Sequence, residues 1–528
     1  MIFAILALAC SGGIENWGDQ GVRFVRDGVI SDSPVEGGRK VGGERWLIER
    51  PWVRGEVVAV GGVERIAPLV PECLPLFHVE LSDISTMAVQ GGVAPNSAVV
   101  FSNDGSKLAI GGVNGELVVV DAWSGEVSAE RRLSESSTKE LAFSKDDSTL
   151  YAAEQSPDAF VHALDPSTLE AKWSFRLADI VESSPLPAGE NRYGLYDLPA
   201  AYRLEVLPDG DIIALATHAW NDESGKRLNR SQLLRLTPGG EIRSAFPEEP
   251  VSATFPHGVI NADVTPPLIA INSGHSADGE PPPGFPSGGV VVVDLDAMRA
   301  ISTHEVEPLG PWFDRNYIWA ALDSDPEVGA LMGFGDGRLV VERLAVEPGA
   351  TPQPHLNLST GTPIMAGEVP ISASVGFGEL LGETIISTTS DTNIPWGAAS
   401  PELRPPTDHP AANALRVHGL DGELLWVWHG EIFIQGLTTS SNGEMAVIGA
   451  GYRASDNRRD LYGAMLFDTT SPRDGRSGEE RILARCPTAN PIFFDHALSD
   501  DGRIAVVEYP YPDGEGGVVG SYRATVLR

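Results

Sequence analysis

One short pattern repeats along most of this sequence and limits what the chain can fold into. A run of apolar and β-branched residues is followed by a polar turn containing Asp, Asn or Gly, and then by a second apolar run. Clear copies lie at 97–127, 139–175, 202–242, 436–451 and 495–509. Two such runs around a tight Asp-Gly turn are typical of a β-hairpin, because Gly readily takes the positive φ that the turn requires. Regular repetition of the hairpin predicts an all-β fold of like units that pack against one another.

The repeated turn carries an acidic or amide residue in each copy, so a metal loop or a catalytic carboxylate has to be weighed against a simple turn. Asp104, Asp147, Asp209, Asn442 and Asp501 occupy or precede this turn. Asp and Asn side chains hydrogen-bond the turn backbone and are favoured there for that reason. One backbone geometry accounts for all five positions, and we therefore interpret them as turn residues.

The repeated units resemble the WD40-like repeats of bacterial β-propellers, in which Phe-Ser-Pro-Asp-Gly-(Lys)-x-(Leu/Ile)-Ala, with an optional Lys, joins the two inner strands of a blade. Residues 101–109 read FSNDGSKLA, with Asn in place of Pro and one inserted residue, and 143–147 and 498–502 are further copies. The resemblance covers 76–528. It implies a propeller fold and leaves the activity open, because propellers host many functions.

The number of units predicts a single propeller of eight four-stranded blades. Blade starts are expected near 97, 139, 202, 257, 317, 371, 433 and 493. Seven blades remain the alternative, because the units at 317 and 371 are irregular. The last unit holds three strands, and the segment 76–82 precedes the first blade without a blade of its own. We expect 76–82 to complete the C-terminal blade, since ring closure removes exposed sheet edges.

The N-terminus predicts export. Residues 1–9 are apolar, a length that suits a secretory signal and not a membrane span. The segment LALAC that ends at Cys10 resembles a bacterial lipobox, which implies cleavage before Cys10 and lipidation of that residue. An ordinary signal peptide with an incidental cysteine is the alternative. Residues 10–75 lack clear periodicity, and we expect a tether and an irregular N-terminal segment there.

Cys73 and Cys486 are the remaining cysteines, and both lie near the predicted seam of the ring. An exported protein can oxidise such a pair. The direction of the strands places the two positions on opposite faces of the ring, whereas a disulfide needs Cα atoms within ~7 Å. Pairing is therefore left open.

The net charge restricts the class of partner. Asp and Glu number 73 against 38 Lys and Arg, which gives a formal charge of −35. Nucleic-acid binding draws on Lys and Arg and is not expected. An acidic surface favours solubility and cationic partners. No later segment is apolar enough to span a membrane, so membrane contact is expected through a lipid anchor only.

Two histidines are expected on innermost strands, which line the channel of a propeller. His257 and His496 fall in blades four and eight, on opposite sides of the ring, which is too far apart for one metal ion. We interpret both as hydrogen-bonded structural residues. The sequences at 202–242 and 421–428 also resemble arylsulfotransferase-like propellers, in which a channel histidine is the nucleophile. That resemblance implies His257 as a catalytic candidate, with Asn261 nearby, and His496 is the other candidate.

Two long insertions are the candidate ligand loops. The Pro-rich segment 390–412 carries Trp396, Arg404, Asp408 and His409, and loops of this length are usually functional or disordered. The segment 273–289 holds Asp278 and Glu280, whose oxygens are of the kind that binds calcium. Their spacing does not fit an EF-hand loop. No other cofactor is predicted.

These features favour an exported, lipid-anchored β-propeller that serves as a binding or scaffold module at the bacterial cell envelope. Its partner would be an envelope protein or a small ligand. The alternative is a propeller enzyme, an arylsulfotransferase-like transferase that works through His257. An enzyme would gather His257 with Asn or Arg at a channel pocket, whereas a scaffold would present a broad, loop-rich face.

Overall fold

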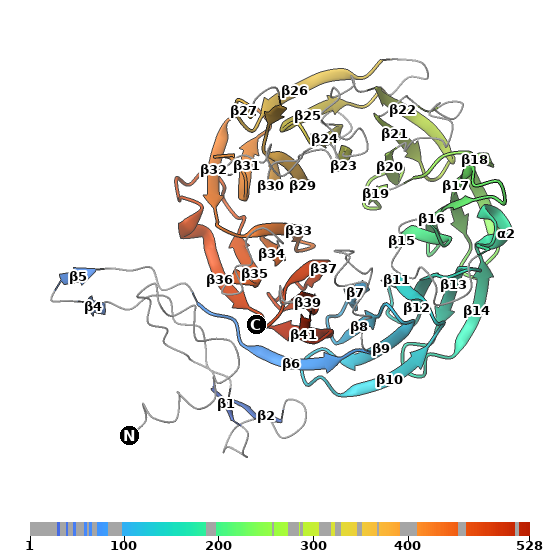
Figure 1. Cartoon of the computed structure of the whole chain (residues 1–528), viewed down its shortest axis with the longest axis horizontal. Helices are drawn as coiled ribbons and strands as arrows, with labels where there is room; N and C mark the ends of the chain where they lie inside the picture. Colours follow the sequence, from blue (N-terminus) through green and yellow to red (C-terminus); the bar gives the residue numbers. More distant parts are fainter. Residues whose placement is uncertain are drawn as a thin grey trace.

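Eight four-stranded antiparallel sheets stand as blades around a central axis in the computed structural model (Figure 1). The first strand of each blade lies nearest the axis and the fourth lies at the rim. The predicted all-β propeller is thereby confirmed, with eight blades and not seven. Apart from the isolated short strands that precede residue 71, the structure describes 71–82, 98–185, 197–255, 258–272, 285, 289–305, 318–322, 329–345, 351–366, 369–390, 409–451, 461–512 and 517–528.

Seven blades are contiguous in sequence. Blade 1 consists of β7 (Ala98–Phe101), β8 (Lys107–Gly111), β9 (Glu116–Asp121) and β10 (Val127–Arg132), and blade 2 consists of β11 (Ser137–Phe143), β12 (Leu150–Gln155), β13 (Phe160–Leu164) and β14 (Ala171–Arg176). Blade 3 consists of β15 (Ala200–Val206), β16 (Ile212–Asn221), β17 (Arg227–Leu236) and β18 (Ile242–Val251). Blade 4 consists of β19 (Gly258–Asn261), β20 (Leu268–Asn272), β21 (Gly289–Asp294) and β22 (Arg299–Glu305). Blade 5 consists of β23 (Ile318–Leu322), β24 (Ala330–Phe334), β25 (Arg338–Arg343) and β26 (Gln353–Ser359). Blade 6 consists of β29 (Ser374–Leu381), β30 (Thr384–Ser390), β31 (Ala414–Gly419) and β32 (Leu424–His429). Blade 7 consists of β33 (Phe433–Thr439), β34 (Met445–Gly451), β35 (Gly463–Asp468) and β36 (Ile482–Pro487).

The eighth blade is built from both ends of the described chain. It comprises β37 (Ile492–Leu498), β38 (Ile504–Glu508), β41 (Arg523–Leu527) and, as its outer strand, β6 (Pro75–Glu80). β6 pairs antiparallel with β41, as the sequence predicted for 76–82. Innermost strands begin at 98, 137, 200, 258, 318, 374, 433 and 492, which lie beside the predicted blade starts.

The remaining elements are short. Strands β1 (Val29–Ser31), β2 (Arg39–Lys40) and β3 (Trp46–Ile48) form one small sheet. Three further pairs are β4 (Val58–Val60) with β5 (Val63–Arg65), β27 (Ile364–Ala366) with β28 (Val369–Ile371), and β39 (Tyr511–Pro512) with β40 (Val518–Val519). The helical elements are the helix α2 (Ala178–Val181) and the 3-10 turn η5 (Glu479–Arg481). Within the residues that the structure describes, no helix is both long and apolar enough to cross a membrane.

The core lies between successive blades. Alternate residues of a strand point to opposite sides of the sheet. Leu108 and Ile110 of β8 therefore pack toward blade 8, while Ala109 packs toward blade 2. Both sides of a blade are buried, which is why the inner strands read as nearly continuous apolar runs such as VVVV in β21.

Antiparallel connectivity gives the ring two different faces. Turns between the first and second strands and between the third and fourth strands lie on one side, which we call the turn face. Connections between the second and third strands, and from one blade to the next, lie on the other side, which we call the connection face. In blade 1, for example, 102–106 belongs to the turn face and 112–115 to the connection face.

The acidic turn residues serve the turn, as the sequence predicted. The Asp104 carboxylate accepts hydrogen bonds from the Ser102 hydroxyl at 2.7 Å and the Ser106 N–H at 2.8 Å. Gly105 follows with φ +66°, where a residue with a Cβ would be strained. Among the described residues, no group of three or more His, Cys, Asp or Glu side chains could hold a metal ion.

Polar contacts on the turn face also link neighbouring blades. The Asp147 carboxylate of blade 2 accepts hydrogen bonds from the backbone N–H of Asn103 at 2.9 Å and of Asp104 at 3.0 Å in blade 1. Ser441 of blade 7 donates its hydroxyl to Asp500 of blade 8 at 2.6 Å. The repeated turn therefore both reverses the chain and fastens one blade to the next.

The expectation that Cys73 and Cys486 lie on opposite faces is wrong. The structure joins them in a disulfide, with Cα atoms 4.5 Å apart. Sheets twist from strand to strand, and the outer strands consequently run along the rim and follow one another around the ring (Figure 1). The end of β36 thus meets the segment before β6, where Glu72 and Arg485 form a parallel bridge.

Candidate functional site

Most of the residues that the sequence singled out as sites lie outside the described part of the chain. These are Cys10, His257, Asp278, Glu280, Trp396, Arg404 and Asp408. Three others, Asn261, His409 and His496, can be placed. Each of the three is engaged with its own chain.

His496 packs between blades 7 and 8. Its Nδ1 lies 2.8 Å from the Thr438 hydroxyl. A Cβ atom on Gly436 would come within 2.4 Å of its Nε2, so the imidazole fills the space that this glycine leaves free. Burial lowers the pKa of His496 to about 4, and the ring is neutral at pH 7. This placement agrees with a structural histidine.

His409 and Asn261 also make internal contacts. His409 is buried, its Nε2 lies 3.0 Å from the Thr362 carbonyl oxygen, and its Nδ1 accepts the Ala411 N–H at 3.1 Å. Nδ1 as acceptor leaves Nε2 as the protonated donor. The Asn261 side chain accepts the Asp263 N–H at 3.2 Å and caps the turn after β19. Both ring nitrogens of His409 are therefore engaged within the chain.

Charged side chains on innermost strands gather inside the ring. Arg203 of β15 pairs with Glu205 at 2.7 Å. Enclosure lowers the pKa of Arg203, but the charges of Glu205, Glu140 and Glu379 outweigh that effect and the net direction is upward. Burial raises the pKa of Glu379, although Thr439 donates a hydrogen bond to it. With three carboxylates near one guanidinium, this part of the channel is acidic.

A cavity of about 590 Å³ opens on the connection face beside blade 2. One wall comes from the connection between blades 1 and 2, with Leu133 and Glu135. The other wall comes from the β12–β13 connection, with Pro157 and Asp158, and from β13, with Phe160. This volume lies in the range of small-molecule sites.

Three polar side chains on adjacent strands line this cavity and form a hydrogen-bonded relay. His162 on β13 lies between Glu154 on β12 and Ser174 on β14. The His162 Nε2 is 2.7 Å from Glu154 Oε1, and its Nδ1 is 2.7 Å from Ser174 Oγ. His162 and Ser174 are direct cross-strand partners, and Glu154 lies diagonally opposite on the same side of the sheet.

The acceptor character of the carboxylate orients the relay. An ionised carboxylate only accepts hydrogen bonds, so His162 Nε2 is the donor to Glu154. In the tautomer whose single ring proton lies on Nε2, Nδ1 accepts the Ser174 hydroxyl. Glu154 is 3 % exposed and His162 is 9 % exposed, while Ser174 is exposed to the cavity. The Ser156 hydroxyl donates to the second Glu154 oxygen at 2.8 Å.

Sequence reasoning missed this relay. Its signal is weak: Glu154 and His162 are polar residues inside otherwise apolar strands, LYAAEQ and FVHAL. The three residues meet only because of the register of three strands, which the repeat pattern does not specify.

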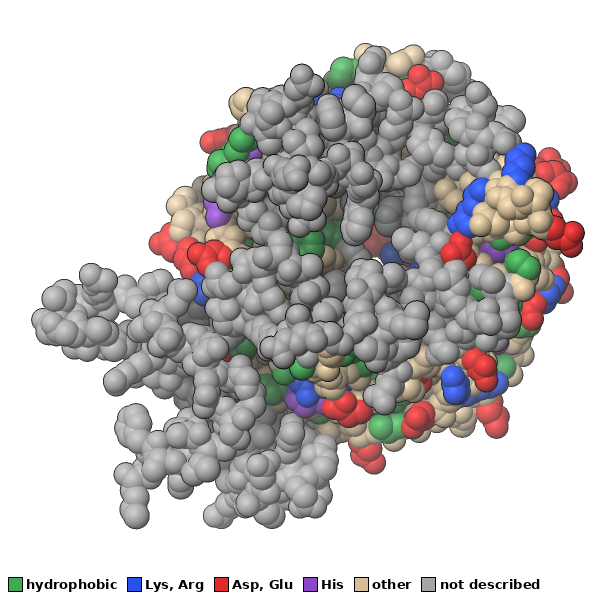
Figure 2. Space-filling model, in the orientation of Figure 1, with side chains coloured by type: hydrophobic (Ala, Val, Ile, Leu, Met, Phe, Trp, Pro, Cys, Tyr) green, Lys and Arg blue, Asp and Glu red, His purple; other side chains and the backbone are tan. Residues whose placement is uncertain are grey.

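Charge around the cavity is mainly acidic. Asp158 forms an ion pair with Arg176 at 2.5 Å. Hydrogen bonds from Arg176 to Asp158 and Asp179 raise the Arg176 pKa, so this cation is already paired. Glu135 is exposed at the other wall. Figure 2 shows acidic and basic side chains interspersed along the rim over β14, β17 and β18.

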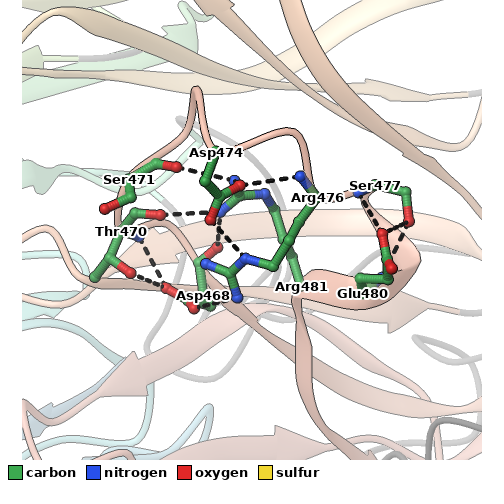
Figure 3. A network of polar contacts seen from close by, with 8 residues as sticks. All are labelled: Asp468, Thr470, Ser471, Asp474, Arg476, Ser477, Glu480 and Arg481. Carbon is green, nitrogen blue, oxygen red and sulfur yellow. Dashed lines mark hydrogen bonds and ion pairs between the residues drawn. The ribbon is translucent and has the colours of Figure 1, made fainter.

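A second polar cluster, on the turn face of blade 7, is structural. Arg481 is fully buried and donates to the carbonyl oxygens of Thr470 at 2.9 Å and Ser471 at 3.1 Å (Figure 3). Asp474 pairs with Arg481 and, at 2.6 Å, with Arg476. These contacts hold the loop between β35 and β36 and use the guanidinium internally.

Among known proteins, only solved structures show a similarity to this chain. No family model matches the sequence, and no curated protein matches it. Similar structures include BamB from Moraxella catarrhalis, with 12% identity, coverage of 67% of this chain and 81% of that chain, and a TM-score of 0.39. The Dos1 propeller has 12% identity, coverage of 86% and 94%, and a TM-score of 0.49. The computationally designed Ika8 protein has 12% identity, coverage of 81% and 95%, and a TM-score of 0.45. Likenesses this distant say nothing of function, and the eight-bladed ring rests on the strand pairing of the chain itself.

Proposed function

We propose that this protein is an exported, lipid-anchored β-propeller that acts as a binding or scaffold module at the bacterial cell envelope. The observation that carries the proposal is the Cys73–Cys486 disulfide, which links positions 413 residues apart. Disulfides persist in oxidising compartments outside the cytosol. Both cysteines are buried at the seam, where the bond fastens the two ends of the ring together.

The two faces of the ring support a binding role. Connections between second and third strands differ widely in length, from 112–115 in blade 1 to 273–288 in blade 4 and 391–413 in blade 6. In blade 8 the same connection carries the β39–β40 hairpin. Variable loops on a rigid scaffold are where binding residues concentrate. With a net charge of −35, a cationic envelope protein or small ligand is the favoured partner.

The test compares wild type with Cys10→Ala, both expressed in a bacterial host. We expect the wild type in the membrane fraction, with the mass of a diacylglyceryl group at a new N-terminal Cys10, and Cys10→Ala without that mass and released from the membrane. Peptide mapping without reductant should recover Cys73 linked to Cys486 in the wild type. Soluble wild-type protein that retains Met1 and has free thiols would overturn the proposal.

The arylsulfotransferase-like alternative depends on His257, which lies outside the described residues. In the part that the structure describes, the other channel candidates, Asn261 and His496, each make a hydrogen bond within the chain. No observation favours that activity over binding, and it is not proposed further.

A further inference from the structure

We propose that Ser174 is a nucleophile, activated by His162 and Glu154, and that the cavity beside blade 2 takes small neutral or cationic carboxylic esters. This inference is independent of where the protein is located and of what it binds. It rests on the geometry of the relay, on the exposure of its serine and on the cavity in front of it.

The relay has the order of groups that nucleophilic catalysis requires. An activated serine needs a base within hydrogen-bond reach and a third group that orients the base. Both separations are 2.7 Å, and Glu154 sets the imidazole tautomer that leaves Nδ1 as the base for Ser174. Glu154 and His162 are buried, and an imidazolium formed there is stabilised by a desolvated carboxylate.

The reaction is an acyl transfer to water. Ser174 Oγ forms a bond to the ester carbonyl carbon while its proton passes to His162 Nδ1. The tetrahedral adduct then breaks its bond to the alkoxy oxygen, which takes that proton and leaves as the alcohol. A water molecule, deprotonated by the same nitrogen, attacks the acyl-serine, and the carboxylic acid leaves as Ser174 regains its proton. No atom is oxidised or reduced.

The walls of the cavity define the class of substrate. Leu133, Pro157 and Phe160 provide apolar surface for an acyl or alcohol group. Glu135 and Asp158 repel anionic esters, and the cationic Arg176 is engaged by Asp158. Neutral esters, and esters of cationic alcohols, fit this combination.

A second relay of the same residue types shows what a purely structural version looks like. Ser302 lies 2.9 Å from His304 Nε2, and His304 Nδ1 lies 2.7 Å from Glu342. Here Ser302 and His304 are buried, and Ser302 also accepts the Ala345 N–H at 3.1 Å. Ser302 cannot reach a substrate, so it serves as an internal control for the reactivity of Ser174.

The experiment labels the folded protein with a neutral fluorophosphonate, maps the adduct by peptide mass and measures p-nitrophenyl butyrate hydrolysis. We expect the adduct on Ser174 and none on Ser302. Ser174→Ala should abolish labelling, and Glu154→Gln, which keeps the shape but removes the charge, should slow hydrolysis about 10²-fold or more. Ser148→Ala, at an exposed serine on the turn face of the same blade, should leave both unchanged. No adduct at Ser174, or hydrolysis that survives Ser174→Ala, would overturn the inference.

Discussion

The turn face and the connection face of the ring are built from the same strands but differ in what their residues do. On the turn face, short turns of one geometry cap themselves and fasten to the next blade, as Asp147 does to the turn of blade 1. On the connection face, segments vary in length, and Ser174 remains exposed in a cavity beside blade 2. The turn face repeats one geometry from blade to blade, whereas the connection face varies and carries the cavity.

Arg235 is the clearest case of a residue that maintains the ring. Its guanidinium pairs with Asp211 at 2.6 Å and Asp209 at 2.5 Å in blade 3, and with Asp296 at 3.0 Å in blade 4. The Arg235 side chain is 7 % exposed and that of Asp211 is 2 % exposed. Removal of the guanidinium would leave Asp211 buried, with only the more exposed Arg243 as a counter-charge.

The largest effect is therefore expected for Arg235→Met. Loss of one partner of a buried ion pair costs about 3–5 kcal/mol, because a desolvated charge is left uncompensated. Arg243→Met is the matched control, since Arg243 also pairs with Asp211 but is 54 % exposed. We expect it to cost less than about 1 kcal/mol. Urea unfolding measures both, and equal losses would show that the burial of Arg235 does not set the cost.

The buried His496, which lies between the two faces, makes the stability of the fold depend on pH. His496 has its pKa lowered to about 4 by burial, against about 6.5 in the unfolded chain. Between these pH values the unfolded state binds the proton and the folded state does not. The free energy of unfolding is therefore highest above pH 6.5 and decreases as the pH falls toward 4. Wild type should lose roughly 2–3 kcal/mol more than His496→Gln between pH 7 and pH 4. Parallel pH profiles in urea unfolding would show that His496 is not buried in this way.

The two Glu-His-Ser relays differ mainly in the burial of their serine, so removal of the two hydroxyls should have different costs. Ser302→Ala removes a buried hydroxyl that serves both His304 and the Ala345 N–H, and we expect a loss of about 1–3 kcal/mol. Ser174→Ala removes an exposed hydroxyl whose place beside His162 can be taken by water from the cavity, and it should cost less than about 1 kcal/mol. Denaturant midpoints of the two variants, measured side by side, are sufficient. A larger loss for Ser174→Ala would mean that Ser174 is structural.

Sequence reasoning succeeded where one local rule repeats. The Asp-Gly turns located the innermost strands, and the unpaired segment before blade 1 indicated the closing strand β6. It failed on the cysteines, because strand direction was considered without the twist that carries the outer strands along the rim. It also missed Glu154, His162 and Ser174, since their meeting depends on the register of three strands. His409 drew attention as a polar loop residue, but only coordinates show that both of its nitrogens are used internally.

The most direct measurement places a photo-crosslinking amino acid at Glu135 on the connection face or at Lys145 on the turn face of the same sector. Both side chains are exposed, and both sites lie close to blade 2. In cells, crosslinking from Glu135 should give a discrete adduct in the envelope fraction, and crosslinking from Lys145 should give none. Adducts from Lys145 alone, or equally from both positions, would contradict the proposal that partners bind on the connection face.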